Sequence, residues 1–184
     1  MGRGGTRPYH DLLGCDAFGN SVTFSRMEDF VPLEPIPGRK TPAQGVKILS
    51  DQPTIVFLTV CAKDRKPWLT QPTVQKSLEE IWRKADAWLV GDYLLMPDHL
   101  HLFCAPRDLK FTIEKWITFW KSQFSRKHLD QDWEWQRKGF HHRLRNAQEY
   151  SEKWLYVREN PIRKNLVKNM DDWKFRGTVH ELRW

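Results

Sequence analysis

Residues 93–104, which read Tyr-Leu-Leu-Met-Pro-Asp-His-Leu-His-Leu-Phe-Cys, constrain the fold more than any other stretch of the chain. Two apolar runs flank a Pro-Asp pair, so the segment predicts two antiparallel strands joined by a tight turn. Because side chains alternate between the faces of a strand, His99 and His101 share one face while Leu100 and Leu102 share the other. Two imidazoles at this spacing can bind one divalent ion, and the apolar residues anchor the strand. A pair of half-buried histidines at a sheet edge is the alternative for His-x-His alone.

The segments on either side of this hairpin carry the patterns of further strands and helices. β-branched and aromatic runs predict strands, and apolar residues at three- and four-residue steps predict amphipathic helices. The predicted strands are residues 54–62, residues 88–96, residues 99–105 and part of residues 133–144. The predicted helices are residues 73–88, residues 112–128, residues 147–159 and, after an interruption at Asn160-Pro161, a short helix at residues 162–169.

This order of elements predicts the architecture. Strand-helix-strand-strand-helix-strand is the plan of the ferredoxin-like fold. We therefore expect an α+β protein, a ferredoxin-like βαββαβ sandwich with an antiparallel sheet and its helices on one face, followed by a C-terminal helix. Residues 1–50 contain seven glycines and five prolines, which break regular elements too often for long ones to form. They are predicted to be an irregular N-terminal extension, with residues 51–184 as the domain.

The net charge of +7 is concentrated in one segment of the chain. Residues 107–169 contain 15 Lys and Arg residues and 8 Asp and Glu residues, so they carry the whole excess. Trp and Phe residues lie between these cations. Cations hold phosphates and flat rings stack on bases, so this composition favours a nucleic acid as partner. A solvated basic face around an ordinary aromatic core is the alternative.

Cysteine usage and hydropathy indicate where the protein works. The three cysteines, Cys15, Cys61 and Cys104, are an odd number without Cys-x-x-Cys spacing. This disfavours structural zinc and a disulfide framework, and it predicts a reducing compartment. No apolar run reaches the roughly 20 residues of a membrane span, and the N-terminal residues lack the apolar core of a signal peptide. We therefore expect a cytoplasmic protein with no membrane partner.

Tyr156 and Asn160 are four residues apart on the third predicted helix, so they project from the same face. If that face packs against the strand of His99 and His101, Asn160 can add an oxygen ligand and Tyr156 lies beside the ion. A phenol, with a pKa of about 10, is a poor nucleophile near neutral pH. It can nevertheless attack a phosphodiester whose oxygen a divalent cation polarises. A core position for Tyr156 and a plain helix end at Asn160 are the alternatives.

Four segments between residues 54 and 167 form a recognisable set. They are Val56-Phe57-Leu58-Thr59, residues 93–101, residues 135–145 and residues 156–163. Their most specific part is a Met-Pro-Asp-His-x-His motif followed, 55 residues after its last histidine, by Tyr-x-x-x-Asn-Pro. In these segments the chain resembles the REP-associated tyrosine transposases, a branch of the single-tyrosine HUH transposases. The extension of residues 1–50 has no counterpart in this resemblance.

The resemblance implies an enzyme that cleaves and rejoins single-stranded or hairpin DNA, such as repetitive palindromic elements, through a 5′-phosphotyrosine and a free 3′-OH. It implies that Tyr156 is the nucleophile and that His99, His101 and Asn160 bind a divalent metal, Mg²⁺ or Mn²⁺. The DNA contacts expected from the basic segment are Lys121, Arg137, Lys138, His141, Arg143, Arg145 and Arg163. We expect a monomer or homodimer. A non-catalytic protein that recognises nucleic-acid hairpins on the same fold is the alternative function.

Overall fold

The computed structural model describes residues 54–129 and 131–183, and the predicted extension of residues 1–50 lies outside them. Within these residues the strands are β1 (Val56–Cys61), β2 (Trp88–Leu95), β3 (His99–Pro106), β4 (Phe140–Arg143) and β5 (Arg176–Thr178). The α-helices are α1 (Pro72–Lys84), α2 (Ile113–Lys127) and α3 (Ala147–Arg163). Short 3₁₀ helices cover Lys63–Arg65 and Met170–Asp172.

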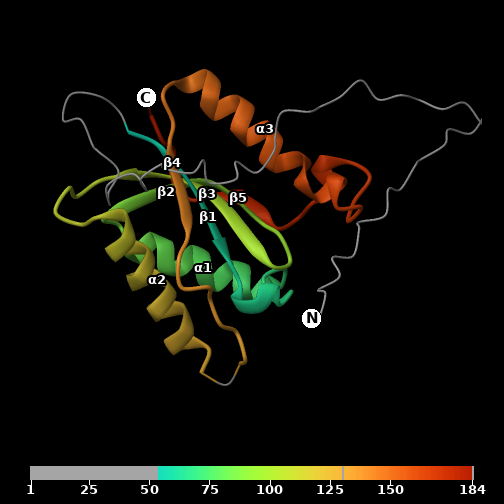
Figure 1. The fold of residues 1–184 in the computed structure, drawn as a ribbon, viewed down its shortest axis with the longest axis horizontal. Helices are drawn as coiled ribbons and strands as arrows, with labels where there is room; N and C mark the ends of the chain where they lie inside the picture. Colours follow the sequence, from blue (N-terminus) through green and yellow to red (C-terminus); the bar gives the residue numbers. More distant parts are fainter. Residues whose placement is uncertain (1–53, 130, 184) are drawn as a thin grey trace, which may run out of the picture. The chain divides into compact units, whose positions relative to one another are not determined.

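The strands form one sheet in the order β4-β1-β3-β2-β5, and every neighbouring pair is antiparallel (Figure 1). The first four strands of the chain, with α1 and α2 between them, make the ferredoxin-like βαββαβ arrangement. The predicted α+β fold is therefore confirmed. β3 lies at the centre, between β1 and β2, so both of its edges are hydrogen-bonded. β5 extends the sheet beyond β2, and its three residues are too short to show a strand pattern in the sequence.

Helices α1 and α2 cover one face of the sheet, as predicted (Figure 1). On this face Leu58, Leu100 and Leu102 of the sheet pack in one cluster with Trp82 of α1 and Trp120 of α2, and all five side chains are fully buried. Completely burying one leucine contributes about 1.5–3 kcal/mol. This cluster is therefore the main stabilising core of the protein.

Helix α3, the predicted C-terminal helix, lies on the opposite face of the sheet (Figure 1). Its Val157 is fully buried in a second cluster with Phe57 of β1 and Phe103 of β3. Two further rings of α3 contact Phe103, Tyr150 with a centroid distance of 4.3 Å and Trp154 with one of 5.9 Å. The helix begins where Asn146 Oδ1 accepts a hydrogen bond from the backbone N–H of the third helical residue. This second, smaller core holds α3 over β1 and β3.

The end of α3 differs from the sequence prediction. The prediction that Asn160-Pro161 interrupts the helix is wrong, because α3 continues to Arg163. Pro161 cannot donate to the carbonyl four residues earlier, but it lies in the last turn, where little of the helix remains to be disrupted. Asn165 then takes a left-handed conformation with a φ of 55°, which asparagine tolerates at helix ends. The predicted short helix at residues 162–169 is therefore absent.

One other predicted boundary moves, and the strand predicted within residues 133–144 is found at its C-terminal end. Helix α1 ends at Lys84, four residues earlier than predicted, because the chain turns there to begin β2 at Trp88. Of residues 133–144, only Phe140–Arg143 is a strand, while Trp135 forms an isolated bridge to Ala62. None of the described helices is long and apolar enough to cross a membrane.

Lys121 is a buried cation of α2. Its side chain is 8% exposed, and its Nζ donates a hydrogen bond of 2.8 Å to the carbonyl oxygen of Gln136. Burial lowers the pKa of Lys121 to about 8, because the ammonium group loses its hydration. The side chain thus ties α2 to the segment that precedes β4.

Replacing Lys121 by Met should make the protein's stability depend less on pH. The lysine has a pKa of about 8 in the folded protein and about 10.4 in the unfolded chain. Between these values the unfolded chain binds more protons, so the lysine gives the wild type a free energy of unfolding that rises with pH. The stability of Lys121→Met relative to the wild type should therefore fall by about 2–3 kcal/mol from pH 7 to pH 10 in urea titrations. Lys115→Met, at an exposed position of the same helix, should show no such trend.

Candidate active site

His99 and His101 lie on β3, the central strand of the sheet. In the register with β1, His101 lies opposite Thr59 and His99 lies opposite Cys61. The two ring centroids are 4.8 Å apart, with an interplanar angle of 85°. The ring of Phe57, part of the core beneath α3, stacks on His101 with a centroid distance of 5.4 Å. Since residues two apart on a strand share a face, both imidazoles lie on the α3 side of the sheet.

A neighbouring side chain holds one ring nitrogen of each histidine. His99 Nδ1 lies 2.7 Å from Asp98 Oδ1, and His101 Nδ1 lies 2.9 Å from Thr59 Oγ1. Arg65 in turn holds the other oxygen of Asp98, at 3.1 Å. A carboxylate only accepts hydrogen bonds, so His99 carries its proton on Nδ1 and presents the lone pair of Nε2. Nδ1 partners of this kind orient metal-binding histidines.

Both histidines are neutral at physiological pH. Burial lowers the pKa of His101 to about 3, and the charges of Lys153 and Arg163 act in the same direction. Burial also lowers the pKa of His99, against the opposing effect of its hydrogen bond to Asp98. The neutral imidazole is the form that binds a metal ion. The environment therefore keeps both rings ready to act as ligands.

Tyr156 lies on α3, the helix that covers the histidine side of the sheet. Its side chain is 39% exposed, although the next residue, Val157, is fully buried. Lys153, one turn earlier, lies between the helix and the sheet. Its Nζ is 5.6 Å from the ring centroid of Phe57 and 5.7 Å from that of Tyr156. Because Phe57 stacks on His101, a continuous set of contacts connects Tyr156 with the histidine pair.

Arg163 connects Tyr156 with Asn160. The guanidinium carbon lies 4.1 Å from the ring centroid of Tyr156, which places the planar cation over the ring face. Arg163 also donates a hydrogen bond of 3.1 Å to Asn160 Oδ1 and another to the carbonyl oxygen of Tyr156. Glu159 Oε2 accepts a further bond of 2.7 Å from it. The last turn of α3 is therefore fixed around the phenol by one arginine.

The donors at this site suit a divalent ion, provided that a side-chain oxygen completes the set. No group of three or more His, Cys, Asp or Glu side chains is arranged to hold a metal anywhere in residues 54–129 and 131–183. The two imidazoles have their Nδ1 atoms engaged, so each offers Nε2. An amide oxygen such as Asn160 Oδ1 keeps a second lone pair while it accepts from Arg163. Nitrogen and oxygen donors of this kind suit Mn²⁺ and, less closely, Mg²⁺.

The structure does not bring the predicted DNA contacts together in one group. Arg163 lies at the site itself. Arg137 and Lys138 are exposed in the segment before β4, and Arg145 is exposed between β4 and α3. Lys121 is buried and bonded to a backbone carbonyl, as described above. The predicted contacts that are exposed away from Tyr156 therefore flank β4 on both sides.

Strand β4 directs its alternate side chains toward different helices. His141 Nε2 lies 3.5 Å from Glu114 of α2, whereas His142 Nε2 lies 2.9 Å from Glu149 of α3. Arg143, two residues after His141, lies on the α2 side with it. The sequence prediction included His141 and Arg143 but not His142, the histidine of this strand that faces α3.

Three residues of this site were not identified from the sequence. Thr59 contacts His101, and Arg65 contacts Asp98, the carboxylate partner of His99. Neither contact can be predicted from the sequence before the pairing of β1 with β3 is known. Lys153 could have been found, because it is three residues before Tyr156 and so lies on the same side of a helix.

The chain is similar to known proteins in its structure, whereas comparisons of its sequence find no match. No protein-family model matches the sequence, and no curated protein matches it. A solved structure of a REP-associated tyrosine transposase bound to a REP hairpin is 23% identical, with a TM-score of 0.58 over 66% of this chain and 74% of that chain. A candidate transposase from Deinococcus radiodurans R1 is 17% identical, with a TM-score of 0.45 over 62% of this chain and 94% of that one. The first likeness shows that this chain shares its fold with that solved structure.

Replacing Thr59 by Val should weaken divalent-metal binding without changing the fold. Valine keeps the shape of the side chain but loses the oxygen that holds His101 Nδ1. Losing such a partner typically costs about 10–100-fold in metal affinity, so the Kd for Mn²⁺ should rise at least tenfold in an EPR titration of the free ion. In the control, Thr118→Val removes a hydroxyl that bonds only the Glu114 carbonyl of α2. An unchanged Kd in Thr59→Val would show that the histidine pair is not the metal site.

Proposed function

We propose that the protein cleaves and rejoins single-stranded or hairpin DNA through a 5′-phosphotyrosine at Tyr156, with a divalent metal ion as cofactor. The observation that carries this proposal is the placement of Tyr156 on the helix that packs over the face bearing His99 and His101. The shared fold supports it, since the similar solved structure is a tyrosine transposase in complex with a DNA hairpin.

In this reaction Tyr156 Oη attacks the phosphorus of the scissile phosphodiester. The bond to the 3′ oxygen breaks, the phenol loses its proton, and the leaving oxygen takes up a proton to become a 3′-OH. The new phosphotyrosine bond conserves the energy of the bond that was broken. A 3′-OH can therefore attack it in the reverse sense and reseal the strand without a nucleotide cofactor.

His99, His101 and Asn160 are the residues that would hold the metal. When bound there, a divalent ion polarises the scissile phosphate and offsets the charge that develops on it. Asp98 and Thr59 hold the two imidazoles in orientation through Nδ1. Arg163 holds Asn160 and the ring of Tyr156 in one arrangement, so the ligand and the nucleophile keep a fixed relation.

Cations around the phenol favour a phosphate there. Lys153 and Arg163 both contact the Tyr156 ring, and a negatively charged phosphate is attracted to positive charge at this point. A phosphodiester brought to this point meets both cations. The exposed residues Arg137, Lys138 and Arg145 can hold the strand further from the site, because phosphate contacts fix the register of a nucleic acid.

Replacing Tyr156 by Phe should abolish cleavage while leaving DNA binding intact. The change removes one oxygen from a side chain that is partly exposed, so packing should change little. A labelled single-stranded hairpin, incubated with Mn²⁺, should give a covalent adduct in a denaturing gel with the wild type and none with the variant. His99→Ala and His101→Ala should also lose the adduct and keep hairpin affinity.

Tyr150→Phe is the matched control on the same helix. Tyr150 donates a hydrogen bond of 2.7 Å to Asp92, so this variant should lose about 1 kcal/mol of stability but still form the adduct. If the adduct is lost in Tyr150→Phe but persists in Tyr156→Phe, the nucleophile is Tyr150 and the proposal for Tyr156 is wrong. If neither wild type nor variants form an adduct yet all bind the hairpin, the protein is a non-catalytic hairpin-binding protein.

Substitutions of Arg163 should slow adduct formation more than they weaken DNA binding. Arg163→Gln removes both the charge and the hydrogen bond donors that hold Asn160, and a loss of at least tenfold in the single-turnover rate is expected. Arg163→Lys keeps the charge but not the planar group over the ring, so it should recover the rate only in part. Full recovery by lysine would show that the residue serves only as a positive charge. The control is Arg158→Gln, at another position of α3, which breaks an ion pair with Asp171 beyond the end of the helix.

A further inference from the structure

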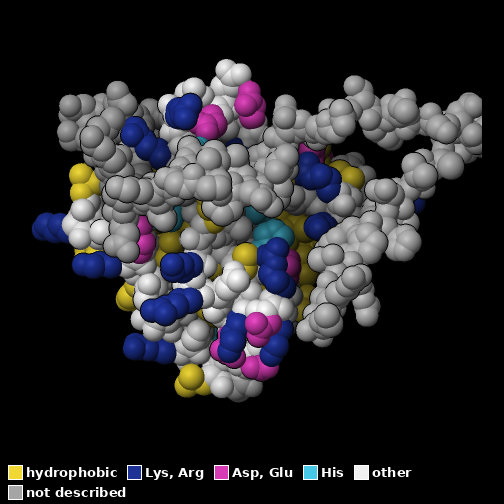
Figure 2. Space-filling model, in the orientation of Figure 1, with side chains coloured by type: hydrophobic (Ala, Val, Ile, Leu, Met, Phe, Trp, Pro, Cys, Tyr) yellow, Lys and Arg dark blue, Asp and Glu magenta, His cyan; other side chains and the backbone are white. Residues whose placement is uncertain are grey.

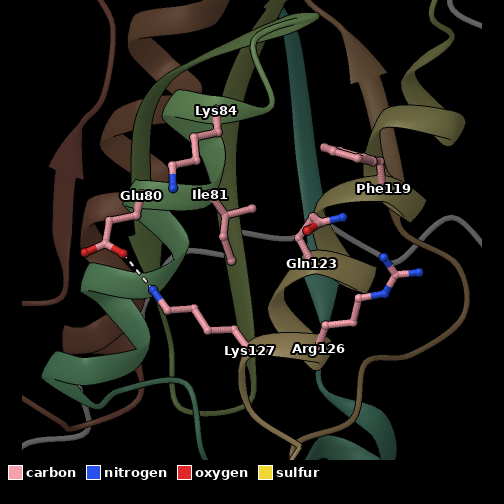
Figure 3. A pocket seen from close by; sticks show the side chains of 7 residues that line it. All are labelled: Glu80, Ile81, Lys84, Phe119, Gln123, Arg126 and Lys127. Atoms are coloured by element: carbon pink, nitrogen blue, oxygen red, sulfur yellow. Dashed lines mark hydrogen bonds and ion pairs between the residues drawn. The ribbon is translucent and has the colours of Figure 1, made fainter.

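A groove of about 510 Å³ lies between α1 and α2, on the face of the sheet opposite to Tyr156 (Figure 3). Its walls come from one side of each helix. They are formed by Glu80, Ile81 and Lys84 of α1 and by Phe119, Gln123, Arg126 and Lys127 of α2. None of these residues takes part in the site described above.

Cross-links between α1 and α2 fix the two walls of this groove. Ser77 Oγ lies 2.9 Å from His128 Nε2 just beyond the end of α2, and Trp116 near the start of α2 donates to the Ala85 carbonyl at 2.7 Å. The two helices therefore run antiparallel. The helices also bury apolar side chains against the sheet. The groove is consequently a preformed feature, and its occupation costs little ordering of the backbone.

The groove is basic and has an accessible aromatic ring. Lys127 pairs with Glu80 at 2.6 Å across the gap (Figure 3). Lys84 and Arg126 stand on opposite walls, and neither forms an ion pair within the described residues. The ring of Phe119 is 51% exposed. Unneutralised cations beside an open ring are the combination by which proteins hold single-stranded nucleic acid.

We propose that the groove between α1 and α2 binds a single strand of DNA, with phosphates at Lys84 and Arg126 and a base stacked on Phe119. The argument is charge complementarity, since three cations and one carboxylate line the walls. In the view of Figure 2, Lys and Arg side chains also gather on the side of the molecule where α2 lies. A strand that crosses this face would be held away from the hairpin site. The inference rests on the proposed function only for its choice of DNA as the ligand.

The test is binding of a fluorescein-labelled oligothymidylate of about 15 nucleotides, which spans a typical site, to the full chain by anisotropy at several salt concentrations. Lys84→Gln with Arg126→Gln should raise the Kd at least fivefold. The slope of log affinity against log salt should become shallower by about 1.4, because each phosphate contact on a single strand contributes about 0.7. The double control Lys110→Gln with Lys168→Gln removes two exposed cations outside the groove, and it should leave both the Kd and the slope unchanged.

Phe119→Leu separates stacking from charge. Leucine keeps an apolar side chain but has no ring, so the Kd should rise about fivefold or more while the salt slope stays as in the wild type. If the groove variants bind the oligonucleotide like the wild type, or no more weakly than the double control, the inference is overturned. The inference is also overturned if the groove variants keep the wild-type affinity for the oligonucleotide but lose a self-association that the wild type shows in sedimentation. The groove would then contact a second copy of the chain.

Failure of the groove proposal can be distinguished from failure of the proposed cleavage reaction. A short hairpin without flanking strands reports the covalent adduct and does not need the groove, so the groove variants should form that adduct at the wild-type rate. Failure of the adduct with every substrate would overturn the proposed chemistry, while a retained effect of the groove variants on oligothymidylate binding would still support the second surface.

Discussion

The alternation of side chains along β3 is the constraint on which the rest of the structure depends. Leu100 and Leu102 are fully buried under α1 and α2, and this burial leaves no freedom in the register of the strand. His99 and His101 must then lie on the opposite face, where α3 packs. A slip of one residue would place imidazoles in the main core and leucines on the face that α3 covers. The packing of the core therefore positions the site.

Helix α3 packs against the sheet and at the same time keeps one aromatic side chain accessible. Val157 is buried and holds the helix on the sheet, while the adjacent Tyr156 remains 39% exposed. Successive helical residues point about 100° apart, so one can pack while its neighbour stays accessible. Arg163 and Lys153 then restrict the exposed ring through contacts on it. An exposed phenol is thereby held in place without being buried, which suits the proposed role of Tyr156 as a nucleophile.

The sequence predicts those features that depend on a local period. The hairpin around Pro97, the shared face of the two histidines and the helix of Tyr156 all follow from periods of two and 3.6 residues, and the structure agrees with them. Features that depend on tertiary context do not follow. Lys121 has the sequence signature of a surface cation but is buried against the carbonyl of residue 136. The continuation of α3 through Pro161 depends on how the last turn packs, which no local rule specifies.

The cations around the site have two effects that support each other. Burial is the largest cause of the lowered pKa of both histidines. Lys153 and Arg163 also lower the pKa of His101, and Lys164 lowers that of His99, so the charges on and just after α3 help to keep both rings neutral. In the proposed reaction the same charges would attract a phosphodiester to the phenol. In the proposed metal site the donors His99, His101 and Asn160 would be neutral, so none of them would reduce the charge of a divalent ion, as a carboxylate ligand would. The full charge of such an ion would then be available to stabilise the pentacovalent phosphate of the proposed reaction.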